Sequence, residues 1–159
     1  MSPAETKAEP VDEVEFGDNI DMNTFEQILE MDEPGDCEFS HSIVFGFFEQ
    51  AEETFVSIDN ALKILTDHHF FRNSREKKDL EELSSLGHFL KGSSATLGLV
   101  KVKNACEAIQ RYGKNENLDG STLDDDEKCL ELIRDSFTAV KKDYDVVKEQ
   151  LERYYENKE

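Results

Sequence analysis

The last quarter of the chain carries an unbroken helical pattern of apolar residues. From about residue 123 to 157, apolar side chains recur three or four residues apart, at Leu130, Ile133, Phe137, Val140, Tyr144, Val147, Leu151 and Tyr154. This spacing places them on one face of an α-helix. Such a helix is on the order of 50 Å long at 1.5 Å per residue. It needs other helices to cover its apolar face.

Three earlier segments show the same period. The first has Phe39 as a hydrophobic staple and Ser40 as its N-cap, and it fades near His68 and His69. Its apolar face consists of Val44, Phe48, Ala51, Phe55, Ile58, Leu62 and Leu65. The second segment starts near Asn73 and stops at Gly98, with Leu80, Leu83, Leu86 or Gly87, Leu90, Ser94 and Leu97 inward. The third ends at Gly113 and buries Val102, Ala105, Cys106 and Ile109.

A short helix is expected before these segments. It begins after Ile20, with Asp21 or Asn23 as its N-cap, and ends before the Pro-Gly-Asp break at residues 34–36. The sequence therefore predicts an all-α protein: an antiparallel four-helix bundle with an additional short N-terminal helix and a long C-terminal helix. Residues 1–19 are polar and aperiodic and are expected to form a flexible acidic leader, with residues 20–159 as the bundle domain.

Charge excludes some classes of partner. The formal net charge of −19 argues against nucleic acid and anionic membrane surfaces and favours a basic partner surface. The three cysteines suit reduced thiols, and no signal peptide or spanning segment is evident. His41, His68, His69 and the cysteines fit no standard zinc spacing, so no metal site is expected. We expect a soluble intracellular monomer.

The segment 86–99 places one histidine opposite the core. His88 lies about 200° around the helix from Leu90 at roughly 100° per residue, so it points away from the bundle interior. The residues three, four and seven positions away are Ser84, Ser85, Lys91, Gly92 and Ala95, and only Lys91 is large. A neutral imidazole exposed in this way is a nucleophile that another protein can enclose. The alternative interpretation is a solvated surface histidine, with Gly and Ser serving a close helix crossing.

The string HFLKGSSATLGL resembles the signature of histidine-containing phosphotransfer domains, approximately His-x-x-Lys-Gly-Ser-Ser-x-x-x-Gly. The matching residues are His88, Lys91, Gly92, Ser93, Ser94 and Gly98. The similarity extends to residues 106–114 and to the segments ILEMDEP and FFEQAEETF, and it is greatest with the fungal phosphorelay intermediates of osmosensing. It covers nearly the whole chain from residue 20.

The resemblance assigns roles to single residues. It implies that His88 is phosphorylated, that Lys91 offsets the phosphate charge and that Gly92 gives a partner access. Ser93 then supports the ring or its phosphate, and Gln110 lies near the histidine. Lys114 stands where the yeast member of the family has Arg, which keeps the charge but loses bidentate geometry. Gln110 as a solvated residue and Lys114 as a helix-end cation remain alternatives.

The resemblance also implies a function. His88 accepts a phosphoryl group from a receiver aspartate of a hybrid histidine kinase and passes it to the aspartate of a response regulator. The chain is then a phosphocarrier rather than an enzyme, with no cofactor of its own, because the receiver supplies Mg²⁺. The implied location is the cytoplasm and the nucleus.

Two further questions stay open from the sequence. Family analogy places receiver docking on the first helices and around the histidine, at Phe25, Ile28, Met31, Asp32, Ser84, Ser85 and Ala95. An equally good explanation of the apolar residues in this set is that they cover the end of the bundle. A phosphorylation-independent interaction module and, more remotely, a metal-dependent helical enzyme are the rival functions.

Overall fold

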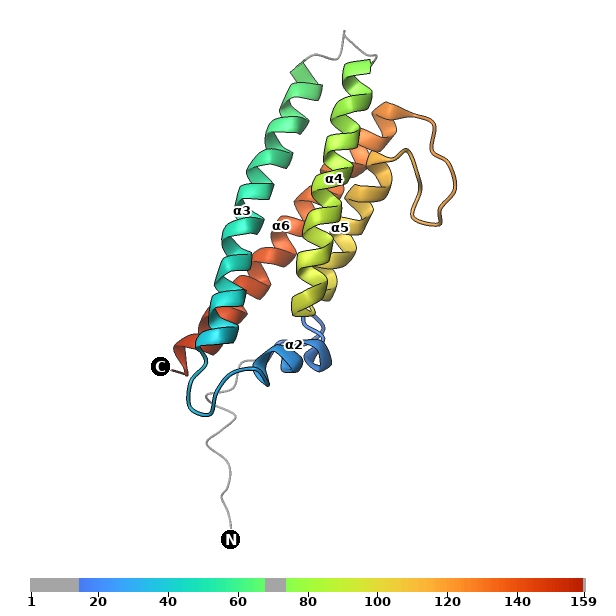
Figure 1. Cartoon of the computed structure of the whole chain (residues 1–159). Helices are drawn as coiled ribbons and strands as arrows, with labels where there is room; N and C mark the ends of the chain where they lie inside the picture. The colour runs from blue at the N-terminus through green and yellow to red at the C-terminus, as the bar shows by residue number, and fades with distance from the viewer. Residues whose placement is uncertain (1–14, 68–73, 159) are drawn as a thin grey trace.

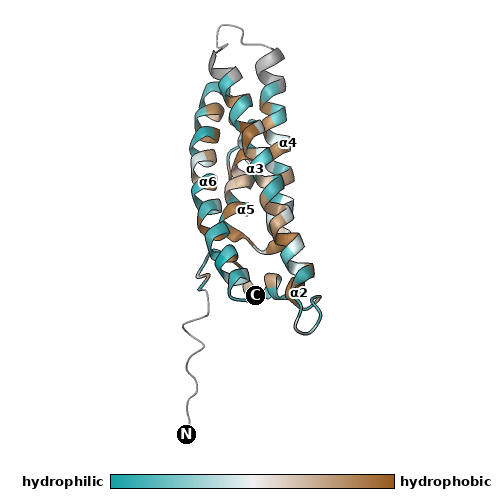
Figure 2. Cartoon of the chain, turned by 90° about the vertical axis from the view of Figure 1, so that its left-hand side faces the viewer, coloured by the Kyte–Doolittle hydropathy of each residue, from teal (hydrophilic) through white to brown (hydrophobic). Residues whose placement is uncertain are grey.

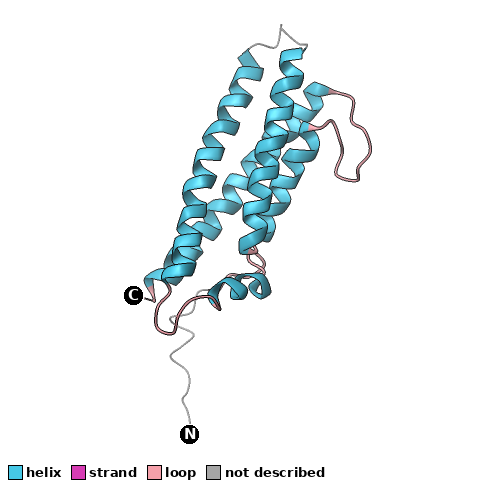
Figure 3. Cartoon of the chain, in the orientation of Figure 1, coloured by secondary structure: helices cyan, strands magenta, loops and turns pink. Residues whose placement is uncertain are grey.

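Five helices form the described part of the chain. The computed structural model describes residues 15–67 and 74–158. Its elements are α2 (Met22–Leu29), α3 (Glu38–Asp67), α4 (Ser74–Leu97), α5 (Val100–Gly113) and α6 (Asp126–Glu156). Within these residues there is no strand, as Figure 3 shows, and only isolated bridges such as that between Ile20 and Leu99 occur. The all-α prediction is confirmed.

The four long helices form an antiparallel bundle, and α2 lies across one end of it (Figure 1). The α4 helix packs most extensively against α5, and α5 packs against α6. At the end of the bundle near α2, the last turn of α6 meets the first turn of α3, because the Tyr155 hydroxyl donates to Ser40 Oγ at 2.7 Å. No described helix is long and apolar enough to span a membrane.

The apolar stripes predicted from the sequence form the core. Figure 2 shows the hydrophobic residues gathered among the helices, while the outer side of α6 is largely hydrophilic. In α3, α4, α5 and α6 the predicted inward residues are buried or half-buried wherever their side chains are described. At the end of α6 the pattern omitted Tyr155, which is buried, while Tyr154 is half-buried because it packs at the edge against Phe16 and Phe25.

The helix ends agree with the sequence at three positions and differ at one. Asp21 caps α2 by accepting from the Asn23 N–H, Gly98 ends α4 with a φ of 78°, and α5 ends at Gly113. Ser40 does not cap α3, because the helix already begins at Glu38. Its buried hydroxyl instead donates to Asp32 Oδ2 at 2.6 Å, and its N–H donates to Asp32 Oδ1 at 2.8 Å. Asp32 therefore fastens the segment after α2 to the start of α3.

The packed domain begins earlier than residue 20. Phe16 is buried against Phe25 and Tyr154, and the Glu15 carbonyl accepts from Gln150 Nε2. Residues 15–19 therefore belong to the bundle rather than to the leader, because an aromatic side chain anchors them. The rest of the predicted leader, the start near Asn73, the Leu65 side chain and His68 and His69 lie outside the described residues.

The buried cysteine of α5 gives a first testable prediction. Cys106 is fully buried, and burial raises the pKa of its thiol to about 12. Because the thiolate is the reactive form, we expect alkylation of Cys106 at pH 8 to be on the order of 10³ slower in the folded protein than in denaturant. Peptide mass spectrometry after timed iodoacetamide labelling measures both rates. Equal rates would contradict the burial of this residue.

Candidate functional site

His88 stands on the exposed face of α4, opposite the buried Leu83 and Leu90. Its ring contacts one side chain of the neighbouring helix, because Gln110 Nε2 on α5 lies 3.2 Å from His88 Nδ1. Gln110 Oε1 is buried and has no hydrogen-bond partner among the described residues. The sequence-based placement of Gln110 beside the histidine is the geometry observed.

The contact with Gln110 distinguishes the two ring nitrogens. As the amide is oriented, it donates to an unprotonated Nδ1; turned over, its oxygen accepts from an Nδ1–H tautomer. In both cases Nδ1 is the nitrogen engaged with α5, and Nε2 has no hydrogen-bond partner in the described part of the chain. The orientation that accepts from Nδ1–H leaves a lone pair on Nε2, which makes Nε2 the nucleophilic atom.

A row of charged side chains runs beside the histidine. Lys91, one turn after His88, lies with its Nζ 3.7 Å from Glu107 Oε1, and Arg111 Nε lies 3.0 Å from Glu107 Oε2. Arg111 also reaches Glu116, at 3.5 Å. The hydrogen bond from Arg111 and the nearby Lys91 and Lys103 charges lower the pKa of Glu107, so its carboxylate is ionised at neutral pH. We call Lys91, Glu107, Arg111 and Glu116 the charged row.

A small depression of about 130 Å³ brings the charged row together with two residues proposed from the sequence. Its walls are Lys91, Glu107, Gln110, Arg111, Lys114 and Glu116. Lys114, an exposed residue just after α5, therefore lies in the same depression as Lys91 and Gln110. The walls carry two ammonium groups and a guanidinium against the carboxylates of Glu107 and Glu116, and this net positive charge suits an anionic group on the ring.

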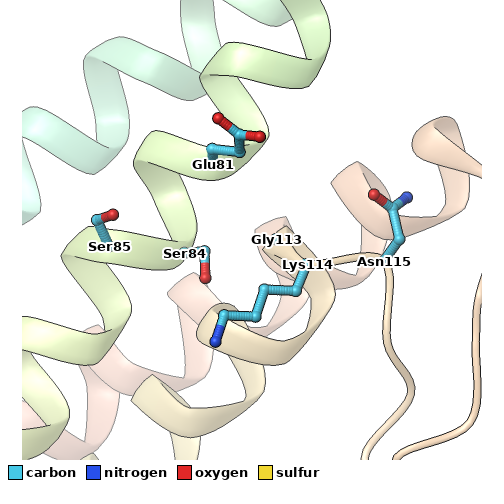
Figure 4. A pocket seen from close by; sticks show the side chains of 6 residues that line it. All are labelled: Glu81, Ser84, Ser85, Gly113, Lys114 and Asn115. Atoms are coloured by element: carbon cyan, nitrogen blue, oxygen red, sulfur yellow. The ribbon is translucent and has the colours of Figure 1, made fainter.

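A second depression lies along α4 toward its N-terminal end. Its volume is about 540 Å³, and it is lined by Glu81, Ser84, Ser85, Gly113, Lys114 and Asn115. Figure 4 shows Ser84 on the side of α4 next to the end of α5, with the Lys114 side chain extended toward it, while Glu81 and Ser85 lie on the same stretch of α4. Lys114 thus borders both depressions, and Ser85 lies exposed one turn before His88.

Two glycines of α4 near the histidine have different surroundings. A Cβ on Gly87 would lie 2.9 Å from both the Cys106 carbonyl oxygen and the backbone nitrogen of Gln110, whereas a Cβ on Gly92 would meet nothing within 4 Å. The close crossing of α4 and α5, which was the alternative explanation for the glycines, therefore applies to Gly87. It does not apply to Gly92, since no atom of the described chain occupies the space beside it, and this space faces outward.

Gly92 can be tested by adding a side chain. We expect Gly92→Ala to stabilise the protein by about 0.5–1 kcal/mol, because Ala favours the helix and the space is open. If a partner uses that space, phosphoryl transfer slows with Ala and slows further with Leu. Gly46→Ala on α3 is the matched control, because a Cβ there also meets nothing within 4 Å. Equal transfer rates for all variants would contradict a role of Gly92 in access.

The hydroxyl of Ser93 bonds within its own helix. Ser93 Oγ donates to the Phe89 carbonyl at 3.3 Å rather than to the imidazole. The next residue, Ser94, is fully buried and belongs to the core face of α4. A role of Ser93 toward a phosphorylated ring stays a prediction.

The predicted docking residues divide into exposed and buried groups. Met31, Ser85 and Ala95 are exposed, and Ile28 and Asp32 are half-buried. Phe25 and Ser84 are buried, so they offer almost no surface to a partner in the free protein. Phe25 packs with Phe16 and Tyr154 under α2, and Ser84 donates to the Gln110 carbonyl at 2.9 Å. Their place is in the packing, and docking by the others remains a prediction.

Sequence reasoning missed three residues around the histidine. Glu107 and Arg111 of the charged row, together with the half-exposed Phe89 next to His88, were not proposed. The i, i+4 spacing of Glu107 and Arg111 is a signal for that pair. The contact of Glu107 with Lys91 depends on the crossing of α4 and α5 and has no sequence signal. Among the described residues, no group of three or more potential metal ligands occurs.

The fold and the site define a helical-bundle protein that presents an exposed histidine, held through one nitrogen by a neighbouring helix and bordered by cations. Residues 43–143 match the family model of the Hpt domain. The chain belongs to the Hpt domain family, a family of phosphotransfer carriers rather than kinases.

Relatives and solved structures agree with this membership. The chain is 45% identical over 138 residues to multistep phosphorelay regulator 1 of Schizosaccharomyces pombe, covering 86% of this chain and 42% of that protein. It is 46% identical to the phosphorelay intermediate protein YPD1 of Candida albicans, over 67% of this chain and 50% of that one. The chain thus spans half or less of the length of these relatives. Saccharomyces cerevisiae Ypd1, solved with the receiver domain of its downstream regulator Ssk1, superposes with a TM-score of 0.68 at 28% identity, covering 87% of this chain and 95% of that one.

Proposed function

We propose that this protein is a phosphorelay intermediate. It accepts a phosphoryl group on His88 from the receiver aspartate of a hybrid histidine kinase and transfers it to the aspartate of a response regulator. The observation that carries the proposal is the exposed imidazole whose Nδ1 lies at Gln110, with Nε2 free of hydrogen-bond partners in the described part of the chain and Lys91 one helical turn away. Support comes from relatives described as phosphorelay intermediates and from the yeast relative solved with a receiver domain.

The transfer step is a displacement at phosphorus. The Nε2 lone pair forms an N–P bond while the bond between phosphorus and the aspartyl oxygen breaks, and the aspartate leaves as a carboxylate. The ring keeps its proton on Nδ1, where Gln110 lies, until solvent removes it. In onward transfer Nδ1 first regains a proton from solvent, and the N–P bond then breaks as the carboxylate oxygen of a second aspartate bonds to phosphorus, which releases neutral imidazole. No nucleotide takes part, and the chain acts as a carrier without kinase machinery of its own.

Residues near His88 adjust charge and access in this proposal. Lys91 and Lys114 face the depression beside the ring and offset the charge of the phosphoryl group. Gly92 leaves space for the receiver, and the receiver brings Mg²⁺ with its acidic pocket. The partners are receiver domains, and we propose that the protein acts as a monomer in the cytoplasm and the nucleus.

The test of this function is a transfer reaction. The receiver domain of a response regulator such as Ssk1, carrying ³²P-labelled aspartyl phosphate, is mixed with the full chain and Mg²⁺. Label that moves to the chain and is lost in acid but kept in base, as phosphohistidine is, supports the proposal. If several receivers bind the chain without transferring label, the phosphorylation-independent interaction module replaces it.

A further inference from the structure

The region around His88 has a charge opposite to that of the molecule as a whole. The chain carries a formal net charge of −19, but the depression beside Gln110 is walled by three cationic side chains, Lys91, Arg111 and Lys114, against two carboxylates, Glu107 and Glu116. Glu107 lies between two of these basic side chains, since it contacts both Lys91 and Arg111. A carboxylate in this position opposes the binding of a second anion.

Glu107 is not needed to hold its two helices together. The side chains of Lys91 and Glu107 are 34% and 33% exposed, and exposed ion pairs contribute little to stability. The backbones of α4 and α5 already touch at two glycines, because a Cβ on Gly113 would lie 2.7 Å from the Leu80 carbonyl, much as one on Gly87 would strike α5. The pair between Lys91 and Glu107 can therefore be broken without separating the two helices.

The geometry of the pair allows Lys91 to leave. Its 3.7 Å separation is longer than the 2.7–2.9 Å typical of a charge-assisted hydrogen bond. Glu107 keeps Arg111 at 3.0 Å after Lys91 departs, so the carboxylate retains a partner. Lys91 lies one helical turn from His88, so its flexible side chain can contact either the Glu107 carboxylate or a phosphoryl group on His88.

We propose that Glu107 is a positioning residue that competes with the phosphoryl group for Lys91. While His88 is unmodified, Glu107 holds Lys91, and on phosphorylation Lys91 moves from the carboxylate to the phosphoryl oxygens. Glu107 thereby disfavours the phosphorylated state and keeps the phosphoryl group ready for onward transfer. This inference rests on the proposed function of His88. It adds that Glu107 sets how the phosphoryl group is distributed between the donor receiver and this chain.

The test compares the equilibrium distribution of label between the receiver and the full chain. We expect Glu107→Gln to raise the ratio of phosphorylated chain to phosphorylated receiver roughly two- to fivefold, the range of an exposed charge interaction. Glu149→Gln on α6 is the matched control, because it removes the same charge from an i, i+4 pair with Arg153, at 3.2 Å, that lies outside the charged row. Thermal unfolding of both variants checks that the fold is retained.

A double-mutant cycle tests whether Glu107 acts through Lys91. In a Lys91→Gln background, the effect of Glu107→Gln should shrink toward that of the Glu149 control. The inference is overturned if Glu107→Gln matches Glu149→Gln, if it lowers the ratio, or if its effect is undiminished without Lys91. Absence of label on the wild-type chain has a different meaning: it contradicts the proposed function and removes the inference with it.

Discussion

Replacing His88 with Gln should leave a folded protein that accepts no phosphoryl group. The side chain is exposed and hydrogen-bonds only to Gln110 among the described residues, so we expect the free energy of unfolding to change by less than about 0.5 kcal/mol. The carboxamide nitrogen of Gln has no nucleophilic lone pair, unlike an imidazole nitrogen, so transfer has no acceptor. Labelled receiver and Mg²⁺, mixed with wild type and variant, measure the loss directly, and circular dichroism measures the fold.

The control for this variant is a second histidine. His41 is half-buried, stacked on Phe45 at 4.1 Å between ring centroids and in edge contact with Tyr155. We expect His41→Gln to accept label at the wild-type level while losing some stability, the opposite of the His88 result. Acid-labile label that persists on the His88 variant would assign the acceptor to another residue. Binding of the receiver to the His88 variant separates loss of chemistry from loss of docking.

Replacing Gly87 with Ala should destabilise the protein by about 1–3 kcal/mol, the usual cost of forcing extra volume into a packed contact. The added methyl group would lie 2.9 Å from two backbone atoms of α5, which cannot move aside as a flexible side chain can. For a chain of this size, the thermal midpoint falls by roughly 2–4 °C per kcal/mol. One of the two atoms is the Gln110 nitrogen, so the variant also moves the carboxamide away from the imidazole.

Gly92→Ala provides the comparison for Gly87→Ala. Both variants add one methyl group to the same helix, five residues apart, and only the Gly87 methyl group meets α5. The thermal midpoint should fall for Gly87→Ala and rise for Gly92→Ala. Equal shifts would show that α4 and α5 are not in close contact at Gly87.

The sequence predicted the helices and the histidine well because both depend on local periodicity. Apolar side chains repeating every three or four residues identify the buried face, and the residue opposite that face is exposed, as His88 is. At helix ends the same reasoning failed for Ser40, whose residue type suits an N-cap. Its observed partners are Asp32 and Tyr155, and the second lies 115 positions away in the chain. Contacts of that range follow from the packing of whole helices.

The surroundings of the histidine also divide into features that the sequence predicts and contacts that depend on how the helices pack. Gln110 was placed correctly by the family pattern, whereas the contact between Lys91 and Glu107 requires the angle and offset at which α4 crosses α5. The helical period already placed Leu86 or Gly87 inward and Gly92 on the face of His88, but the close approach of the α5 backbone to Gly87 follows only from the position of α5. Phe16 lay in a polar segment, where a single aromatic residue gives no periodic signal.

The backbone contacts of α4 with α5 at Gly87 and Gly113 affect how binding proceeds. Helices that touch in this way cannot slide or tilt without separating a packed interface, so the imidazole on one and the carboxamide on the other keep a fixed arrangement in the free protein. Association then removes little conformational freedom from this side of a complex. Under the proposed function, one rigid surface of this chain binds both the donor receiver and the acceptor receiver. The loops of the receivers then provide the adaptation to this surface.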